Sequence, residues 1–429
     1  MNICMMTNTY LPHVGGVARS VDTFVQEYRR MGHRVFVVAP EFPDMPESET
    51  DVVRVPALQN FNGSDFSVRL PIPGFLRRAL EDFRMDIVHA HHPFLLGDTA
   101  LRVASEREVP IVFTHHTLYE QYTHYVPFDS EVLQRFVIEM STRFANLCDG
   151  VIAPSGSLAK LIRERGVEVP IEVVPTGVDL DAFAAGDGAA IRRELGIADD
   201  ALVIGHVGRL AKEKNLEFLT RAVARCLKRN GEACFLLVGG GSFEERIVEI
   251  MREEDVEDRL YRAGKRMGTE LANAYSAMDV FAFSSKSETQ GVVLVEAMAA
   301  GSPVVALDAS GARDVLEDGK NGRLLAADAG EGEFAEALSE LVQDSERCEQ
   351  LRRGAAETVR EYSREATSKR ALAFYERTIA EDARSRKDLP ENTYFAKLLR
   401  QIETEWNLLA GRAESARAVI TRTDEPRTK

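Results

Sequence analysis

The sequence predicts an α/β fold made of two Rossmann-like, doubly wound domains with a helical C-terminal extension. Short β-branched runs alternate with helical patterns along the chain, as in parallel sheets covered by helices. The alternation begins again after a connector near Pro175. The chain also has 429 residues, which exceeds the size at which a single hydrophobic core keeps growing. Two domains are therefore expected.

Six runs in the first half are expected to form one parallel sheet. In such sheets ligands bind beyond the carboxyl ends of the strands, so the loops that follow these runs are candidate sites. The runs are Ile3–Met6, Arg34–Ala39, Ile87–Ala90, Ile111–Thr114, Gly150–Ala153 and Ile171–Val174.

The second half repeats the rhythm, and a helical segment follows it. We expect domains at 1–178 and 179–362, with helices at 363–429 that cross back to the first domain and include an amphipathic stretch at 393–418. This extension could pack on either domain or on a second subunit of a homodimer. The expected strands of the second sheet are Val203–Val207, Cys234–Val238, Leu260–Ala263, Val280–Phe283 and Pro303–Leu307.

Composition limits the class of protein. With 45% hydrophobic and 28% charged residues, the chain reads as an ordinary globular protein. Its net charge of −15 argues against nucleic-acid binding, which needs a basic surface. Five widely spaced cysteines without a C-x-x-C pair indicate reduced thiols, and neither a secretory signal nor a spanning helix is visible. We expect a cytoplasmic location, with any membrane contact at the inner surface.

Glu288 and Glu296 flank Gly291, where a helix is expected to begin. The backbone N–H groups at Gly291, Val292 and Val293 could receive a diphosphate, because unpaired donors and the helix dipole both favour anions there. The two carboxylates could then bind sugar hydroxyls on either side of the phosphates. The alternative is a solvated glutamate on an ordinary helix, since this spacing often arises by chance among 68 acidic residues.

One further candidate loop follows the first expected strand of each half. Gly15 and Gly16 would let backbone donors approach a phosphate or sugar, although an ordinary turn is equally compatible. In Gly208–Asn215, Arg209 and Lys214 could neutralise a diphosphate, unless they form a solvated cluster with Glu213.

Eight of the nine histidines precede residue 125, in clusters at His89–His92 and His115–His116. A metal site is the alternative, but no carboxylate or thiol cluster accompanies them, which favours hydrogen bonding to a ligand. The Asp179-Leu-Asp181 pattern follows Pro175, so a turn or helix cap is expected there rather than a metal site.

Together, four motifs resemble the retaining family 4 glycosyltransferases, whose GT-B fold has two Rossmann-like domains facing across a cleft. The resemblance covers about residues 1–382. The motifs are Pro12–Val17, Gly208–Asn215, Val174–Asp179 and the glutamates around Gly291. The resemblance implies that Glu296 holds the donor ribose and Glu288 the transferred sugar.

The resemblance further implies that Arg209 and Lys214 bind the diphosphate, that Gly16 lies beside phosphate and sugar, and that His116 touches the sugar near the reacting carbon. Such enzymes retain the anomeric configuration and need no metal or other cofactor. The predicted catalytic residues are His116, Glu288, Arg209 and Lys214; the predicted donor-binding residues are Gly15, Gly16, Arg209, Lys214, Lys265, Arg266, Glu288, Gly291, Val292, Val293 and Glu296.

Within that family, the 91–97 and 114–125 segments look like the bacterial 1,2-diacylglycerol 3-glucosyltransferases. Glucose transfer from a UDP-sugar to diacylglycerol is therefore expected, with a soluble acceptor or a non-catalytic nucleotide-sugar-binding subunit as alternatives. The segment 66–80 could lay an apolar face and a basic rim on a membrane, or pack on the first domain with its arginines solvated. The predicted acceptor-binding residues are His92, Tyr119, Tyr122, His124 and Tyr125.

Overall fold

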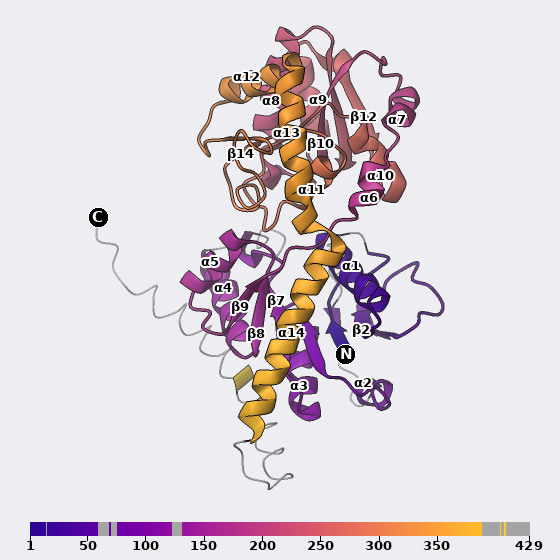
Figure 1. Ribbon diagram of the computed structural model, residues 1–429, viewed down its shortest axis with the longest axis vertical. Coiled ribbons are helices and arrows are strands. Elements are labelled where there is room, and N and C mark those ends of the chain that lie inside the picture. Colours follow the sequence, from indigo (N-terminus) through magenta and orange to yellow (C-terminus); the bar gives the residue numbers. More distant parts are fainter. Residues whose placement is uncertain are drawn as a thin grey trace, which may run out of the picture. The chain divides into compact units, whose positions relative to one another are not determined.

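A computed structural model of the chain describes residues 1–13, 15–58, 68–69, 75–121, 131–387, 404 and 407–408. The chain forms two compact units, one of residues 1–177 with the segment from residue 367, and one of residues 178–366. Each unit is built on one sheet whose strands are all parallel (Figure 1). The predicted pair of Rossmann-like sheets is confirmed.

The sheet of the first unit has the strand order β3-β2-β1-β6-β7-β8-β9. The order reverses direction at β1, so the chain winds outward on both sides of the central strand. The strands are β1 (Asn2–Met6), β2 (Arg34–Pro40), β3 (Val52–Val55), β6 (Ile87–Ala90), β7 (Ile111–Thr114), β8 (Gly150–Ala153) and β9 (Ile171–Val173), with an antiparallel pair β4 (Ala57–Leu58) and β5 (Val68–Arg69) outside the sheet.

Both faces of this sheet are buried. Ile3 and Met5 of β1 belong to a different hydrophobic cluster from Cys4 and Met6, because alternate strand residues point to opposite faces. Helices α1 and α14 cover the first face, and α3, α4 and α5 cover the second. The helices of the unit are α1 (Gly16–Arg30), α2 (Phe75–Ala79), α3 (Leu96–Arg107), α4 (Glu131–Asn146), α5 (Gly156–Glu164) and α14 (Arg364–Lys387), which begins in the other unit.

The second unit repeats this plan with the strand order β12-β11-β10-β13-β14-β15. Its strands are β10 (Leu202–Arg209), β11 (Ala233–Gly240), β12 (Leu260–Gly264), β13 (Val280–Phe283), β14 (Val304–Leu307) and β15 (Arg323–Leu325). Its helices are α6 (Leu180–Ala184), α7 (Gly188–Leu195), η3 (Lys212–Lys214), α8 (Leu216–Arg229), α9 (Glu244–Glu253), η4 (Glu257–Arg259), α10 (Gly268–Ser276), α11 (Val292–Ala299), α12 (Glu331–Gln343), α13 (Ser345–Thr358) and η5 (Val359–Tyr362).

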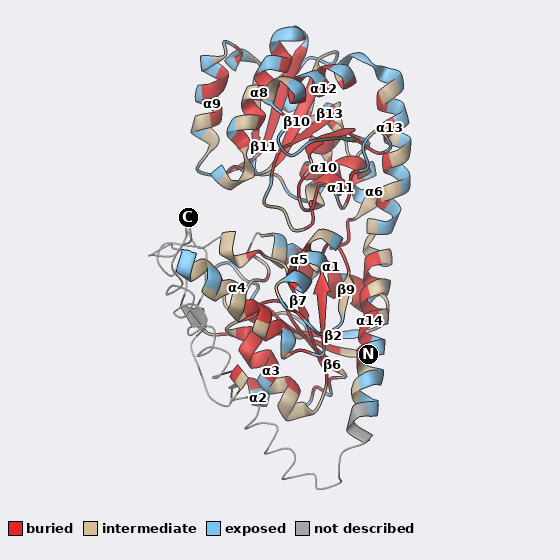
Figure 2. Ribbon diagram, turned by 90° about the vertical axis from the view of Figure 1, so that its left-hand side faces the viewer, coloured by how far each residue is buried: buried red, intermediate tan, exposed pale blue. Residues whose placement is uncertain are grey.

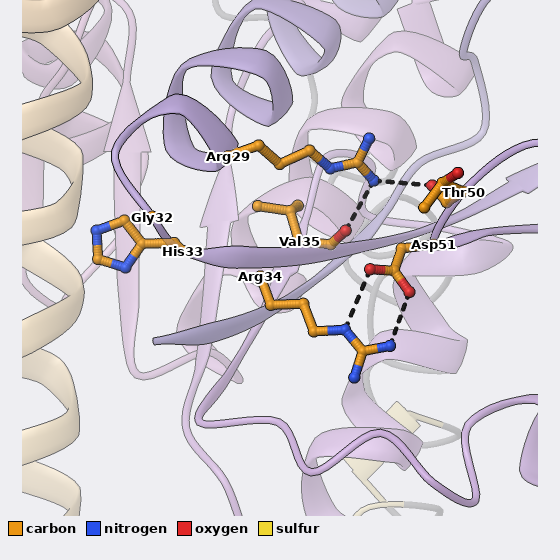
Figure 3. A pocket seen from close by; sticks show the side chains of 7 residues that line it. All are labelled: Arg29, Gly32, His33, Arg34, Val35, Thr50 and Asp51. Atoms are coloured by element: carbon orange, nitrogen blue, oxygen red, sulfur yellow. Dashed lines mark hydrogen bonds and ion pairs between the residues drawn. The ribbon is translucent and has the colours of Figure 1, made fainter.

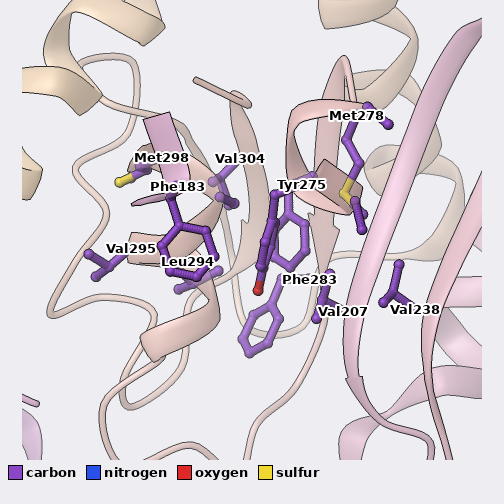
Figure 4. Close-up of a cluster of buried hydrophobic side chains, with 14 of the residues drawn as sticks. Phe183, Val207, Val238, Tyr275, Met278, Phe283, Leu294, Val295, Met298 and Val304 are labelled. Atoms are coloured by element: carbon purple, nitrogen blue, oxygen red, sulfur yellow. The ribbon is translucent and has the colours of Figure 1, made fainter. Parts of the chain in front are cut away.

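The inner strands of both sheets are buried, whereas β3, β9, β12 and β15 at the sheet edges are largely half-buried and the helices keep exposed outer faces (Figure 2). On one face of the second sheet, Tyr275 of α10 lies in a cluster with Phe183, Phe283 and Leu294, drawn in Figure 4. This packing fixes α10 and α11 against the carboxyl half of the sheet, where the candidate site lies.

The structure also bears on two local expectations. Asp179 caps α6, accepting a hydrogen bond from the Ala182 N–H at 3.0 Å, so the predicted helix cap is confirmed. The stretch 393–418 lies outside the described residues except for residues 404 and 407–408. Within it, Thr404 donates to Ser105 at 3.1 Å and Leu408 joins the core of the first unit.

Candidate functional site

The end of β10 and the loops after β10 and β13 carry four charged side chains that form two ion pairs. The Lys214 ammonium donates to the Glu288 carboxylate at 2.6 Å, and Arg209 pairs with Glu213. The Lys214 and Glu288 side chains are only 14% and 24% exposed, so their charges are partly shielded from water. Residues 74 positions apart thus form one polar centre at the carboxyl edge of the sheet.

Two reciprocal hydrogen bonds hold these loops in register. The Asn215 side-chain amide donates to the Ser284 carbonyl at 3.1 Å, and the Ser284 hydroxyl donates to the Asn215 carbonyl at 3.0 Å. Because β10 and β13 are neighbours in the sheet, these bonds fix the loops where their strands end. The two loops that carry Lys214 and Glu288 are therefore joined by side-chain-to-backbone hydrogen bonds.

Gly291 is the N-cap of α11 and has a left-handed backbone with φ of 73°. A Cβ atom there would also lie 2.9 Å from the Gly311 carbonyl oxygen. Glycine is required on both grounds, since L side chains rarely adopt this φ and the neighbouring backbone leaves no room. The predicted helix start is confirmed, and Val292 and Val293 form its first turn.

Glu296 lies inside α11 and is 1% exposed. The Tyr275 hydroxyl donates to its carboxylate at 2.8 Å. Tyr275 itself is held in the apolar cluster of Figure 4, so this carboxylate is fixed from the core side. A glutamate buried so completely requires hydrogen-bonding partners, which argues against the alternative of a solvated helix residue.

The sequence prediction missed a glycine run and a histidine beneath the charged loop. A Cβ at Gly239 would lie 1.9 Å from the Gly208 carbonyl oxygen, and one at Gly241 would lie 2.2 Å from that of Leu210. His206 of β10 is 2% exposed and its Nδ1–H donates to the Ala282 carbonyl at 3.0 Å. Three consecutive glycines after an apolar run were a usable signal for this close backbone contact.

Lys265 and Arg266 follow β12, as expected. Arg266 pairs with Glu194 and with Glu270, and its guanidinium also donates to the Ala263 carbonyl at 2.9 Å. These bonds give Arg266 a structural role in shaping the loop. Lys265 lies along Gly240, where a Cβ would meet its Cε atom at 3.2 Å.

In the first unit the histidines gather at the ends of β6 and β7, which are neighbouring strands. His91 Nδ1 and His116 Nε2 are 2.9 Å apart, so one ring donates to the other. His91 is fully buried and His116 half-buried. Burial first, and the neighbouring histidines second, hold the pKa of both rings well below the usual range. The pair is neutral at pH 7.

Gly15 and Gly16 stand at the start of α1, which follows β1. Gly15 is the N-cap with extended backbone, and Gly16 is the first helical residue. A Cβ added at Gly16 would meet nothing within 4 Å. Neither the backbone nor the packing therefore explains a glycine at this position.

Among the predicted acceptor residues, His92 and Tyr119 are described, while Tyr122, His124 and Tyr125 lie outside the described residues. His92 Nδ1 accepts from the Asn8 N–H at 3.1 Å, and His92 is 6% exposed. The buried Tyr119 hydroxyl has no hydrogen-bond partner among the described residues. Its ring packs edge-on against Phe94, with 5.4 Å between centroids.

The described part of segment 66–80 packs on the first unit. Leu76 and Leu80 are buried in its core, while Arg77 and Arg78 are exposed and Arg77 pairs with Glu106 at 3.2 Å. The alternative of a packed helix with solvated arginines is thus confirmed for residues 76–80. No helix in the described part of the chain is long and apolar enough to cross a bilayer.

A shallow basic hollow lies at the amino end of β2, away from the carboxyl edges (Figure 3). Its arginines already have partners: Arg29 donates to the carbonyls of Val35 and Thr50, and Arg34 pairs with Asp51 at 2.8 Å. We assign no ligand to it. Among the described residues, no group of three His, Cys, Asp or Glu side chains is placed to hold a metal ion.

Known proteins resemble both units. Residues 14–182 match Glycosyltransferase Family 4, and residues 187–358 match Glycosyl transferases group 1. An alpha-monoglucosyldiacylglycerol synthase of Streptococcus pneumoniae is 30% identical over 80% of this chain and 78% of its own length. A GDP-mannose-dependent alpha-mannosyltransferase of Mycobacterium tuberculosis is 31% identical over 81% of this chain and 89% of its own.

The crystal structure of HepE from Anabaena in complex with UDP is similar in fold, with a TM-score of 0.69. It is 21% identical, and the alignment covers 88% of this chain and all of that one. The two parallel sheets are those of the GT-B fold, which the solved neighbour shares. The chain belongs to glycosyltransferase family 4, and it is a hexosyltransferase.

Proposed function

We propose that this enzyme transfers a hexose, most simply glucose, from a UDP-sugar to diacylglycerol or a related lipid at the membrane surface, with retention of configuration. The lipid acceptor is supported by similarity to the monoglucosyldiacylglycerol synthase, and the uridine base by the fold shared with the UDP-bound protein. The nucleotide-sugar part of this proposal rests on the Lys214–Glu288 ion pair, which is partly shielded from water and lies in the loops next to the glycine N-cap of α11.

The donor site combines cations with sugar-binding carboxylates. Lys214 and Arg209 bind the diphosphate and exchange their carboxylate partners for phosphate oxygens as the donor enters. Glu288, released from Lys214, accepts hydrogen bonds from hydroxyls of the sugar. The amides at Val292 and Val293 add donors for the phosphates, and Glu296 contacts the ribose.

The reaction follows the same-face course. The acceptor hydroxyl oxygen bonds to the anomeric carbon while the bond from that carbon to the β-phosphate oxygen breaks. The electron pair stays on the departing phosphate, which takes the acceptor's proton. Arg209 and Lys214 stabilise the charge that grows on this phosphate, and this is the dominant catalytic term. The neutral ring of His116 binds the sugar near the reacting carbon, and no metal takes part.

A soluble acceptor is the second candidate, and one observation favours it. Leu76 and Leu80 of the segment expected to meet a membrane are buried in the protein's own core. A basic rim at Arg77 and Arg78 would then be the membrane contact that remains in this helix, and the overall charge of −15 opposes binding to an anionic surface.

The decisive experiment is a matrix of donors and acceptors with purified protein. UDP-glucose, UDP-galactose and GDP-mannose are each combined with diacylglycerol vesicles and with simple polyols, and the products are analysed by mass spectrometry and anomeric NMR. We expect an α-linked glucosyl lipid from UDP-glucose. Transfer to polyols alone would establish the second candidate, and a β-linked product would refute retention.

A further inference from the structure

A buried chain of hydrogen bonds joins helix α14 to the histidines at the ends of β6 and β7. The Tyr28 hydroxyl donates to the Tyr375 oxygen at 3.3 Å, and the Tyr375 oxygen lies 2.6 Å from His89 Nδ1. His89 Nε2 lies 2.6 Å from the Thr114 hydroxyl oxygen. All four residues belong to the first unit and are at most 3% exposed.

The direction of the bond between the two tyrosines favours one tautomer of His89. Tyr28 supplies its proton to the Tyr375 oxygen, so Tyr375 keeps its own proton for His89 Nδ1. Nδ1 then accepts, and the single proton of the neutral ring sits on Nε2 and is donated to Thr114. Burial lowers the pKa of His89 to about 3, which keeps the ring neutral at pH 7.

His89 in turn sets the surroundings of the His91–His116 pair. The rings of His89 and His91 are 4.0 Å apart between centroids, and His91 Nδ1 holds His116 Nε2 at 2.9 Å. His91 is fully buried, and its Nε2 has no hydrogen-bond partner among the described residues. Contact with the His89 ring and the bond to His116 are therefore main determinants of the His91 orientation.

We propose that Tyr375 is a positioning residue for sugar transfer, acting through His89 on the His91–His116 pair. The inference rests on the proposed contact between His116 and the sugar. Tyr375 lies in α14, beyond residue 358, where the second family match ends, so a helix outside both matched regions completes the support of this pair. Phenylalanine would fill the same space but leave His89 Nδ1 buried without a donor.

The test compares Tyr375→Phe with Tyr28→Phe. Both side chains are fully buried and both variants lose one hydroxyl, but Tyr28→Phe keeps the Tyr375 hydroxyl, which can still donate to His89 Nδ1, whereas Tyr375→Phe removes that donor. We expect Tyr375→Phe to lower kcat about tenfold, the equivalent of one buried hydrogen bond, with little change in donor KM. Tyr28→Phe should have a much smaller effect. Equal kcat values for the two variants would overturn the proposal.

Nitrogen-15 NMR of histidine-labelled protein reads the tautomer directly, without substrate. His89, assigned by comparison with His89→Gln, should show a protonated Nε2 and a bare Nδ1 in the wild type, and should lose this pattern in Tyr375→Phe. A proton on Nδ1 in the wild type would overturn the proposal. If Tyr375→Phe does not fold, Thr114→Val removes the partner at the other end and should disturb the same signals.

The two proposals fail separately. Normal turnover in His116→Asn would refute the sugar contact of His116, whereas the NMR pattern and the comparison of the two tyrosine variants test Tyr375. If the His116 contact is refuted but the His89 NMR pattern is as expected, Tyr375 still sets the His89 tautomer but has no role in sugar transfer.

Discussion

Lys214 and Glu288 form a hydrogen-bonded ion pair of 2.6 Å between the loops that follow two neighbouring strands. Each side chain is less than a quarter exposed, so neither charge is fully solvated. In the proposed mechanism this pair opens when the donor enters, because the diphosphate is a stronger partner for the ammonium. In that mechanism the free enzyme already holds both groups close to where they would act.

Replacing either partner should reduce transfer much more than folding. We expect Lys214→Met and Glu288→Gln each to lower kcat/KM by about 10²-fold or more, because a donor to the leaving group or to the sugar is lost. The double variant should lose less than the product of the two, since residues in one pair are not additive. Lys212→Met, an exposed lysine in the same turn, serves as control. Steady-state kinetics that are unchanged in both single variants would refute the donor site.

Arg209 should act by stabilising the negative charge that develops on the leaving phosphate. Arg209→Ala is expected to cost about 2–4 kcal/mol of transition-state stabilisation, measured as the change in kcat/KM, by analogy with lost oxyanion donors. Arg252→Ala is a matched control, because that arginine is exposed and also pairs with one glutamate, Glu257, at 2.8 Å. A similar loss in both variants would mean that Arg209 acts through stability alone.

Gly291 and Gly301, at the two ends of α11, separate two costs of adding a side chain: backbone strain and steric contact. Both have positive φ, 73° and 82°, but a Cβ at Gly301 would meet nothing within 4 Å. Gly301→Ala should cost about 1 kcal/mol of unfolding free energy for the backbone alone. Gly291→Ala should cost roughly 1–3 kcal/mol more, because its Cβ meets the Gly311 carbonyl. Urea unfolding measures both, and equal losses would contradict the close contact with Gly311.

Local sequence patterns predicted the buried strands and one helix start. The buried strands and the helix start after Gly291 were visible because apolar runs and a glycine mark them. Strands β3 and β15 were missed, since they are short, mostly half-buried and carry Arg54 and Arg323. Such strands lack the continuous apolar run of a buried parallel strand.

Contacts over long sequence separations were beyond these patterns. Tyr375 and His89 are 286 positions apart, and their contact depends on α14 returning to the first sheet. The Lys214–Glu288 pair likewise follows from β10 lying beside β13, which spacing along the chain does not reveal. The sequence therefore singled out Lys214 and Glu288 separately and offered Glu213 as a partner of Arg209, but it did not predict that Lys214 pairs with Glu288.

Gly16 offers a test in which stability and function should separate. Its position is helical, exposed and without neighbours, so Gly16→Ala should leave the free energy of unfolding unchanged or raise it by up to about 1 kcal/mol. If a phosphate or sugar approaches this backbone, the added methyl group should raise the donor KM. Gly231→Ala, also exposed and without neighbours, is the control. Unaltered kinetics in Gly16→Ala would remove Gly16 from the donor site.

The buried histidines predict that stability falls below neutral pH. Burial lowers the pKa of His92 to about 3 and that of His206 to about 4, against 6.5 in the unfolded chain. Between these values the unfolded chain binds a proton that the folded chain does not, so the free energy of unfolding decreases as pH falls. Each such histidine should contribute a slope of about 1.4 kcal/mol per pH unit in this window.

The variant His206→Asn isolates one of these contributions, because an asparagine amide can still donate to the Ala282 carbonyl. Urea unfolding between pH 8 and pH 4.5 measures the free energy of unfolding. Below pH 6 this free energy should fall less steeply in the variant, by about 1.4 kcal/mol per pH unit, the slope for one bound proton. Above pH 7.5 neither state binds a proton at this residue, so the two curves must run parallel there. Parallel curves at low pH as well would show that His206 is protonated in the folded protein.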